Sequence, residues 1–484
     1  MNCGMIAQSI GLLLYIEAAC MIPSFAVAMI YGGGDARAFL FSILSVSAAA
    51  FAARLVKPAR KDIYAKDGYA IVGLGWLLAS AFGALPFIVS GAIPHPADAF
   101  FESVSGFTTT GATILRDIES LSAGILFWRS FTHWVGGMGV LVLMLAILPS
   151  AGAKAFLIMR AETTGPSADK FVPKVGSAAK ILYGIYALIT LAQAVLLCLG
   201  GMTVYDSLVH TFGTVGTGGF SDKNTSVAAF GSVYIEMVIA VFMMLSGVNF
   251  TLYYSLLRRD WKSVLHDEEL RFYCALIFAA ALGVTLNTYM GGVYKSIVEA
   301  ARYASFQVIS IITTTGFSTA DFNVWPSASQ FVLLILMLVG ASAGSTGGGM
   351  KCVRIILLAK IARREFLRLI HPNSVSVVKL NGKTVESETL AGVLIFFFLY
   401  IAALVAATVL ISLDGSDLVT SATSVLSCVG NVGPGLGVVG PAGSFAGFSP
   451  LCKLALSLCM VAGRLEIYPV MLLCVPEFWR RGNH

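Results

Sequence analysis

Apolar runs of about 20 residues recur along the whole chain, which is the length that a membrane-spanning helix requires. The first run extends from Ile6 to Tyr31. It is too long for the apolar region of a signal peptide and has no basic residues before it, so we expect a retained membrane helix. Shorter, half-polar runs lie between the long ones, and each precedes a stretch rich in threonine or glycine. The pattern predicts an all-α polytopic membrane protein.

The order of these runs repeats four times after two N-terminal transmembrane helices. Each unit reads as a spanning helix (M1), a short re-entrant pore helix, an extended loop and a returning helix (M2). We expect the two-helix element in 1–66 and the repeats in 67–165, 166–265, 266–383 and 384–484. Because all four units begin and end on the same side of the membrane, they must be parallel and related by an axis along the membrane normal. This arrangement gives a pseudo-fourfold pore.

Composition and charge agree with this topology. Hydrophobic residues make up 57% of the 484 residues and charged residues only 12%, whereas soluble domains average about 25% charged. Lysine and arginine cluster around residues 54–66, 154–180, 258–271, 354–383 and 480–481. The positive-inside rule places these five segments, and both termini, in the cytoplasm. The net charge of +6 therefore reflects topology, and no nucleic-acid partner is expected.

Four loops can be aligned on a glycine that follows the short helices. Threonine is a poor helix former because its β-branched side chain loses rotamer freedom. We therefore expect the apolar helix that precedes Thr313 to end at Ile312. Extended backbone inside a membrane leaves carbonyl oxygens unsatisfied, and a cation can satisfy them. Four such strands around one axis would form carbonyl rings like those of potassium-channel filters. The candidate filter residues are Thr108, Thr109, Thr110 and Gly111; Gly216, Thr217, Gly218 and Gly219; Thr313, Thr314, Thr315 and Gly316; and Gly430, Asn431, Val432 and Gly433.

The returning runs each break at small residues, in 136–139, 246–249, 348–351 and 462–466. The third break is the most glycine-rich, since it extends back to Gly340. Residues 340–351 contain five glycines, and a segment of this composition cannot form a stable helix. Non-helical backbone at membrane depth is tolerated where it is buried in protein or lines a water-filled cavity. We therefore expect a gate below the filter. Its candidate residues are Gly340, Gly344, Gly347, Gly348, Gly349 and Lys351, together with Arg464, which lies in an otherwise apolar helix.

Taken together, these motifs resemble the Trk/Ktr/HKT superfamily of potassium transporters. The stretches SFTHWVGGMGV at 130–140, GSTGGGMKCVR at 344–354 and GRLEIYP at 463–469 are similar to the Trk-type pore subunit in particular. The resemblance covers essentially the whole chain. It implies potassium uptake, with K⁺ as the bound and transported ion and Rb⁺ as a permeant substitute, across the cytoplasmic (inner) membrane of a bacterium. It also implies a homodimer with a TrkA-like ring of nucleotide-binding regulatory subunits docked on its cytoplasmic side.

The same resemblance implies roles for individual residues. Carbonyl groups of the second and third residues of each loop, with the following glycines, would coordinate the ion. Plant members with sodium selectivity carry serine where this chain has Gly111, so potassium selectivity is implied here. The sequences GTGG at 216–219 and NVGP at 431–434 depart from fourfold identity, and we therefore expect an asymmetric pore.

Other readings remain open at this stage. An alternating-access transporter, or potassium symport coupled to H⁺ or Na⁺, would also use broken helices. An enzyme is not expected, because the chain has no HExxH motif and no large soluble loop. Arg129 is expected to snorkel from a helix end, and His133 to pack at the interface with a local hydrogen bond.

Overall fold

The computed structural model describes residues 1–58, 64–139, 175–372 and 376–479. The expected boundary between the first two repeats, at 165 and 166, lies outside these residues, as does much of the basic segment 154–180. Within the described parts the chain is mostly helical, and the one sheet is a hairpin of β1 (Lys379–Leu380) and β2 (Lys383–Thr384). The prediction of an all-α membrane protein is confirmed.

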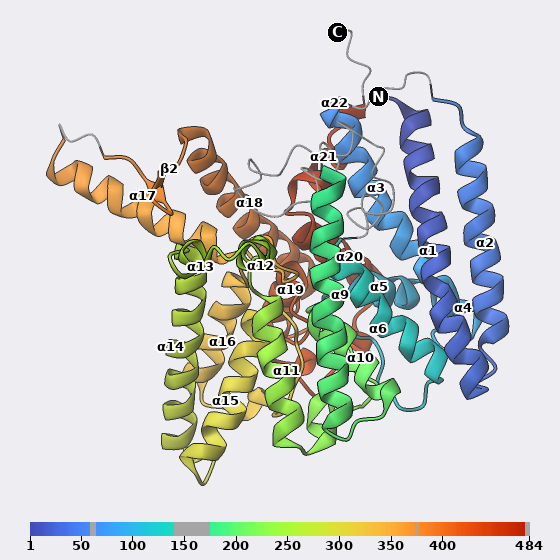
Figure 1. Cartoon of the computed structure of the whole chain (residues 1–484), viewed down its shortest axis with the longest axis horizontal. Coiled ribbons are helices and arrows are strands. Elements are labelled where there is room, and N and C mark those ends of the chain that lie inside the picture. The colour runs from blue at the N-terminus through green and yellow to red at the C-terminus, as the bar shows by residue number, and fades with distance from the viewer. Residues whose placement is uncertain (59–63, 140–174, 373–375, 480–484) are drawn as a thin grey trace.

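Six helices in the described parts are long and apolar enough to cross a membrane. The first two, α1 (Cys3–Tyr31) and α2 (Ala36–Leu55), form an antiparallel pair along one side of the bundle (Figure 1). The others are α3 (Ala65–Gly83) continuing into α4 (Leu85–Val89), α9 (Val175–Leu199), α14 (Glu268–Met290) and α18 (Ser387–Ser412). The last helix, α22 (Pro476–Trp479), lies at the same end of the molecule as the N-terminus (Figure 1).

Four short helices follow α4, α9, α14 and α18 in the chain. They are α5 (Pro96–Phe107), α10 (Val204–Val215), α15 (Ile297–Ile312) and α19 (Leu418–Gly430). Side chains of Thr203, Ser296 and Asp417 cap three of them by accepting a hydrogen bond from a backbone N–H of the first turn, which satisfies a donor that the helix leaves unpaired. Helix α15 ends at Ile312, as its threonine run predicts.

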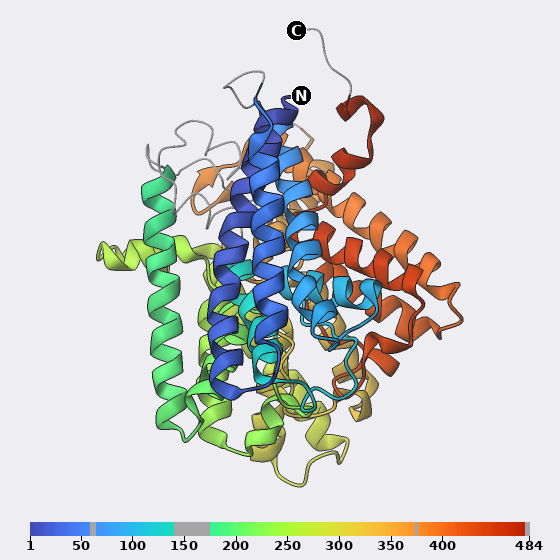
Figure 2. The ribbon, with the colours of Figure 1, turned by 90° about the vertical axis from the view of Figure 1, so that its right-hand side faces the viewer.

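Four returning helices come next, and each ends at the small-residue break that the sequence predicts. They are α6 (Ala123–Gly137), α11 (Val233–Ser246), α16 (Ser327–Val339) and α20 (Pro450–Arg464). After its break the chain turns by 90° from α11 into α12 (Phe250–Leu257), and α12 leaves the bundle sideways (Figure 2). Helix α17 (Cys352–Ile370) projects outward after the third break (Figure 1), and α21 (Tyr468–Cys474) follows the fourth.

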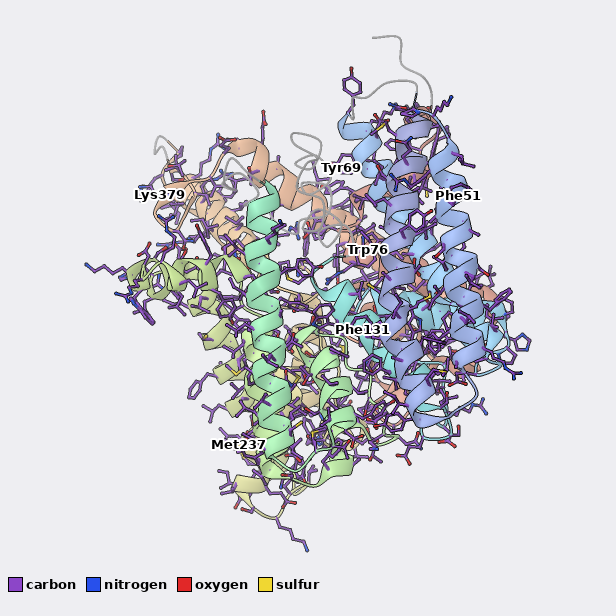
Figure 3. All side chains as sticks on the ribbon, turned by 45° about the vertical axis from the view of Figure 1, so that its right-hand side comes forward. Phe51, Tyr69, Trp76, Phe131, Met237 and Lys379 are labelled. Carbon is purple, nitrogen blue, oxygen red and sulfur yellow. The ribbon has the colours of Figure 1, made fainter. Side chains whose placement is uncertain are left out.

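The remaining elements are short. They are α13 (Trp261–Leu265) and the 3₁₀ turns η3 (Ser226–Phe230), η4 (Phe322–Val324), η5 (Gly437–Val439) and η6 (Phe445–Gly447). Large apolar side chains cover the outside: Phe51 on α2 is 59% exposed and Met237 on α11 is 62% exposed (Figure 3). Trp76 of α3, by contrast, is buried. An apolar exterior of this kind is what a lipid-facing surface requires.

Candidate functional site: a ring of four glycine loops

The four predicted loops share one backbone conformation. Loops 1 to 4 are residues 108–111, 216–219, 313–316 and 430–433. The second residue of each is left-handed although it is not glycine, with φ of 54°, 55°, 57° and 53° for Thr109, Thr217, Thr314 and Asn431. The fourth residue is a glycine that also has positive φ in each loop. Left-handed threonine costs about 1–2 kcal/mol, so the surrounding structure must hold these loops in place.

Contacts between neighbouring loops close a ring. A Cβ atom built on Gly111 would lie 2.0 Å from the carbonyl oxygen of Gly218, and one on Gly219 would lie 2.0 Å from that of Thr315. A Cβ on Gly316 would lie 2.2 Å from the carbonyl oxygen of Val432. The last loop returns to the first, because a Cβ on Gly433 would lie 2.7 Å from the carbonyl oxygen of Thr110. Each glycine therefore makes room for a carbonyl group of the next loop around the ring.

The carbonyl groups of Thr110, Gly218, Thr315 and Val432 take no part in the backbone hydrogen bonds that hold the loops. The N–H of the same residue in each loop donates back to its own short helix: Thr110 to Ser105, Gly218 to Gly213, Thr315 to Ser310 and Val432 to Ser427, at 2.8–2.9 Å. Their carbonyl oxygens accept no hydrogen bond from any described residue. Buried carbonyl groups are normally paired, so the ring presents four oxygens that are available to a ligand.

Polar side chains of the loops bond to one another and to the scaffold. The hydroxyl groups of Thr108 and Thr110 lie 2.7 Å apart in loop 1, and those of Thr313 and Thr315 lie 2.9 Å apart in loop 3. The Asn431 side chain donates to Thr110 Oγ1 at 3.0 Å and so ties loop 4 to loop 1. A cavity of about 110 Å³ adjoins the ring and is lined by all four loop glycines, Gly111, Gly219, Gly316 and Gly433.

The glycine-rich segment Gly340–Lys351 packs directly against these loops. A Cβ on Gly347 would lie 3.0 Å from the carbonyl oxygen of Thr313, and one on Gly348 would lie 2.4 Å from that of Gly430. The Gly348 N–H donates to Thr314 Oγ1 at 2.6 Å. The glycines thus allow the segment to approach the backbone of loops 3 and 4.

Helices from the second and third units hold the glycine-rich segment from outside. The Ser342 N–H donates to the carbonyl of Gly247 at 3.1 Å, and the Phe250 N–H donates to that of Gly344 at 3.0 Å. The buried Glu269 Oε1 accepts from the N–H groups of Ala343 and Val353, at 2.7 and 3.0 Å. The segment is therefore fixed at its start and at its end.

Arg464 joins the glycine-rich segment to the first unit. Its Nη1 donates to the carbonyl of Thr346 at 2.6 Å, and its Nη2 donates to those of Gly136 and Gly137 at 2.7 and 2.6 Å. The side chain is only 8% exposed. A Cβ on the preceding residue, Gly463, would lie 2.1 Å from the carbonyl oxygen of Val429, so the arginine follows a close contact with the base of loop 4.

Two further basic residues, Lys351 and Arg354, lie where the glycine-rich segment joins α17. Lys351 Nζ donates to the carbonyl of Gly347. Arg354 pairs with Glu466 and stacks on the Phe396 ring at 3.9 Å. Glu466 thus pairs with Arg354, although it stands only two residues from Arg464; it lies beyond the end of α20 and has a φ of 56°.

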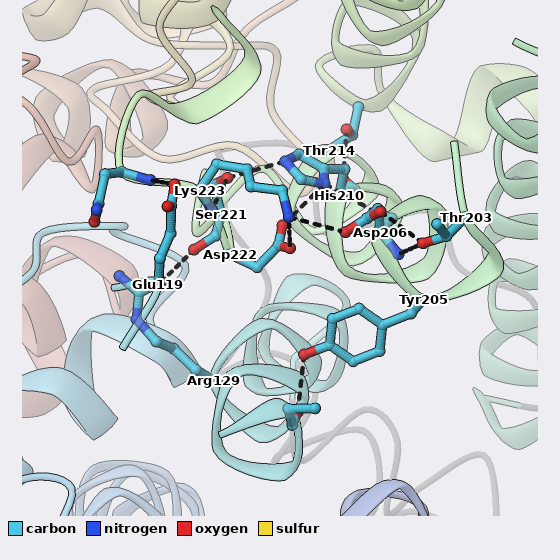
Figure 4. Close-up of polar contacts among 12 residues, drawn as sticks. Glu119, Arg129, Thr203, Tyr205, Asp206, His210, Thr214, Ser221, Asp222 and Lys223 are labelled. Atoms are coloured by element: carbon cyan, nitrogen blue, oxygen red, sulfur yellow. Dashed lines mark hydrogen bonds and ion pairs between the residues drawn. The ribbon is translucent and has the colours of Figure 1, made fainter. Parts of the chain in front are cut away.

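The prediction that Arg129 snorkels from a helix end is wrong. Its side chain is buried and its Nε lies 2.6 Å from the Glu102 carboxylate, which also accepts from the Ile114 N–H at 3.0 Å. Its Nη1 donates to the Ser221 carbonyl at 2.9 Å, and Figure 4 shows Arg129 in the polar network that includes Ser221. A buried charge requires a partner. Glu102 and Arg129 are opposite charges in two separate apolar runs, and this is the sequence signal from which their ion pair could have been predicted.

Comparisons with known proteins decide the family. The model of the family described as "TrkH: Cation transport protein" matches residues 36–481. The chain belongs to this TrkH family. It is 39% identical over 482 residues to the Trk system potassium uptake protein TrkH of Escherichia coli (strain K12), covering 98% of this chain and 99% of the relative. It is 32% identical to the TrkG protein of the same organism, with 97% of each chain covered.

A solved structure extends the agreement to three dimensions. The crystal structure of the potassium transporter TrkH from Vibrio parahaemolyticus matches with a TM-score of 0.89 at 34% identity, covering 99% of this chain and 100% of that one. The resemblance to the Trk type that the sequence motifs indicate is therefore confirmed, as is the fold class. Relatives with this name are transporters, which agrees with the expectation that the chain is not an enzyme.

Proposed function

We propose that this protein takes up potassium across the cytoplasmic membrane of a bacterium through a selective filter made by loops 1 to 4. The observation that carries the proposal is the closed ring formed by the carbonyl groups of Thr110, Gly218, Thr315 and Val432, each of which lies against the glycine of a neighbouring loop. Such oxygens replace the hydration shell of a cation. The relatives TrkH and TrkG are potassium uptake proteins, which supports K⁺ as the transported ion.

In this proposal the four helix–loop–helix units, 67–165, 166–265, 266–383 and 384–484, surround the ion path, and 1–66 is an added hairpin. Both termini are cytoplasmic, in agreement with the placement of α22 and the N-terminus at one end (Figure 1). The segment Gly340–Lys351 is the gate, because it packs against loops 3 and 4 with little side-chain bulk. Arg464 is an electrostatic barrier that also holds the gate through the Thr346 carbonyl.

The proposed assembly is a homodimer with a cytoplasmic ring of nucleotide-binding regulatory subunits. Helix α17 follows the gate segment directly and carries a basic, outward-projecting C-terminal half (Figure 1). A partner that moves this helix would act on the gate through Lys351 and Cys352, where the segment joins the helix.

The test is Rb⁺ uptake into proteoliposomes, with K⁺ and Na⁺ as competitors and the membrane potential varied. We expect K⁺ to compete far better than Na⁺, and uptake to follow the potential without a gradient of H⁺ or Na⁺. Uptake that requires such a gradient would instead support the coupled symporter. Uptake without any preference for K⁺ over Na⁺ would overturn the filter. Complementation of a potassium-uptake-deficient bacterium checks the activity in cells.

A further inference from the structure

Loop 2 lacks a side chain at the position where the other loops have one. Gly218 stands where loops 1, 3 and 4 have Thr110, Thr315 and Val432. Its backbone does not explain this, because Gly218 is not among the glycines with positive φ. Space does explain it: a Cβ on Gly218 would lie 2.3 Å from Cγ of His133 and 2.4 Å from Nδ1. The imidazole therefore occupies the volume that a loop side chain would fill.

His133 comes from α6, the returning helix of the first unit, and it connects two loops. It is fully buried, with Nδ1 at 2.7 Å from the carbonyl oxygen of Gly106, at the end of α5, and Nε2 at 3.2 Å from the backbone nitrogen of Phe220. A carbonyl can only accept and a backbone N–H can only donate, so the ring is neutral with its proton on Nδ1. The expectation of an interfacial histidine with one local bond is wrong.

Arg129 supports the same stretch from one turn earlier on α6. Its guanidinium lies 3.5 Å from the centre of the Phe220 ring, and the His133 ring lies 4.1 Å from that centre. Residues four apart share one face of a helix, so this face of α6 holds the residues that follow Gly219. Loop 2 is thus positioned by side chains of the preceding unit.

We propose that His133 is a specificity-determining positioning residue of the filter. It takes the place of the side chain missing at Gly218 and fixes the carbonyl that loop 2 contributes to the ring. Its bond to Phe220 holds the residue that follows loop 2. Its bond to Gly106 holds the imidazole of His133 against the end of α5 in the first unit. This inference rests on the proposed function, since it assigns K⁺/Na⁺ discrimination to that ring.

Two amide variants separate the two hydrogen bonds. Asparagine at 133 can place an amide nitrogen near the position of Nδ1, which keeps the bond to Gly106 and loses the bond to Phe220. Glutamine can place an amide oxygen near the position of Nε2 and keeps the bond to Phe220. We expect His133→Asn to lower the K⁺/Na⁺ competition ratio in Rb⁺ uptake by about fivefold or more, the order expected for loss of one buried hydrogen bond. His133→Gln should stay within about twofold of wild type.

A second set of variants tests the steric half of the proposal. Gly218→Ala alone should abolish uptake, because its Cβ cannot coexist with the imidazole. His133→Ala should allow uptake with a lowered ratio, and the double variant His133→Ala with Gly218→Ala should recover uptake relative to Gly218→Ala. A coupling of this kind is what a double-mutant cycle measures for residues in contact. Thermal melting of each purified variant shows that it is folded.

The outcomes distinguish this inference from the proposed function. If wild-type uptake shows no preference for K⁺, the proposed function fails. If wild type is selective and folded His133→Asn and His133→Ala keep its ratio while only the rate falls, His133 is merely structural and the inference is overturned. Equal ratios for His133→Asn and His133→Gln, or a double variant no better than Gly218→Ala, would overturn it as well.

Discussion

Replacing Arg464 by alanine removes a charge and its hydrogen bonds to three carbonyl groups of the described residues, at one point beside the proposed ion path. The guanidinium donates to the carbonyl groups of Thr346, Gly136 and Gly137 at 2.6–2.7 Å. Glu466, two residues further along the chain, pairs with Arg354. Alanine would therefore lower a positive potential and release the gate segment at Thr346.

The size of the effect follows from two terms. A guanidinium and a K⁺ ion about 4 Å apart repel each other by about 4 kcal/mol at an effective dielectric constant near 20. The three carbonyl dipoles that accept from the arginine reduce this field, so we treat that value as an upper bound. Each hydrogen bond to a charged group contributes about 1.5–3 kcal/mol, and its loss would loosen the proposed gate at Thr346. We expect K⁺ flux to rise by about tenfold, which corresponds to about 1.4 kcal/mol.

The assay is Rb⁺ influx into proteoliposomes at a fixed membrane potential, normalised to the amount of folded protein. Arg464→Lys is the control, because it keeps the charge but lacks the planar fork that bonds several carbonyls at once. A rise for alanine alone points to the electrostatic barrier, and an equal rise for both points to the gate tether. Unchanged or lower flux in an alanine variant of normal thermal stability would refute both roles.

Three further predictions concern the ring, the gate and the support of loop 1. Gly111→Ser should raise Na⁺ permeability relative to K⁺ in the same assay, because its Cβ would lie 2.0 Å from a ring carbonyl; Gly91→Ser, which has a similar φ of 76° and open space around it, should leave the ratio unchanged. Deleting Ser342–Gly348 should give high, poorly regulated Rb⁺ flux, and wild-type flux after the deletion would remove the gate from the proposal. Glu102→Gln should destabilise the protein by about 3–5 kcal/mol, because it leaves a buried arginine without its counter-charge; thermal melting should show little change for the exposed Glu365→Gln.

The sequence predicts those parts of the fold that depend on local physics. Apolar runs give the spanning helices, and β-branched residues followed by glycine give the end of α15 at Ile312. Small residues, with at least one glycine at each site, give all four breaks of the returning helices, because the cost of glycine in a helix does not depend on the partner. The alignment of four loops agrees with the backbone turn that they share, but it does not predict the left-handed second residue, because threonine rarely adopts that conformation.

Contacts between side chains of different units could not be predicted from local sequence patterns. Arg129 lies 27 positions from Glu102 and 92 from Ser221, and its neighbours are set by the packing of α5, α6 and α10. Its place near a helix end predicts a side chain that snorkels toward the membrane surface, but the structure shows a buried ion pair with Glu102. For His133 the signal was indirect, in the glycine at position 218 that interrupts the threonine pattern.

The two loops that break the threonine pattern show how one ring is built from four different sequences. Loop 4 has Asn431 in the left-handed position, a residue that tolerates this conformation, and its side chain bonds to Thr110 Oγ1 and to the Met460 carbonyl at 3.0 and 2.9 Å. Loop 2 has no side chain at Gly218 and is supported by the imidazole of His133 instead. In both cases the support crosses from one unit to another, whereas loops 1 and 3 bond their own threonines together. The four loops therefore share one backbone turn while their supports differ, so a substitution in one support should alter selectivity without any change to a loop residue.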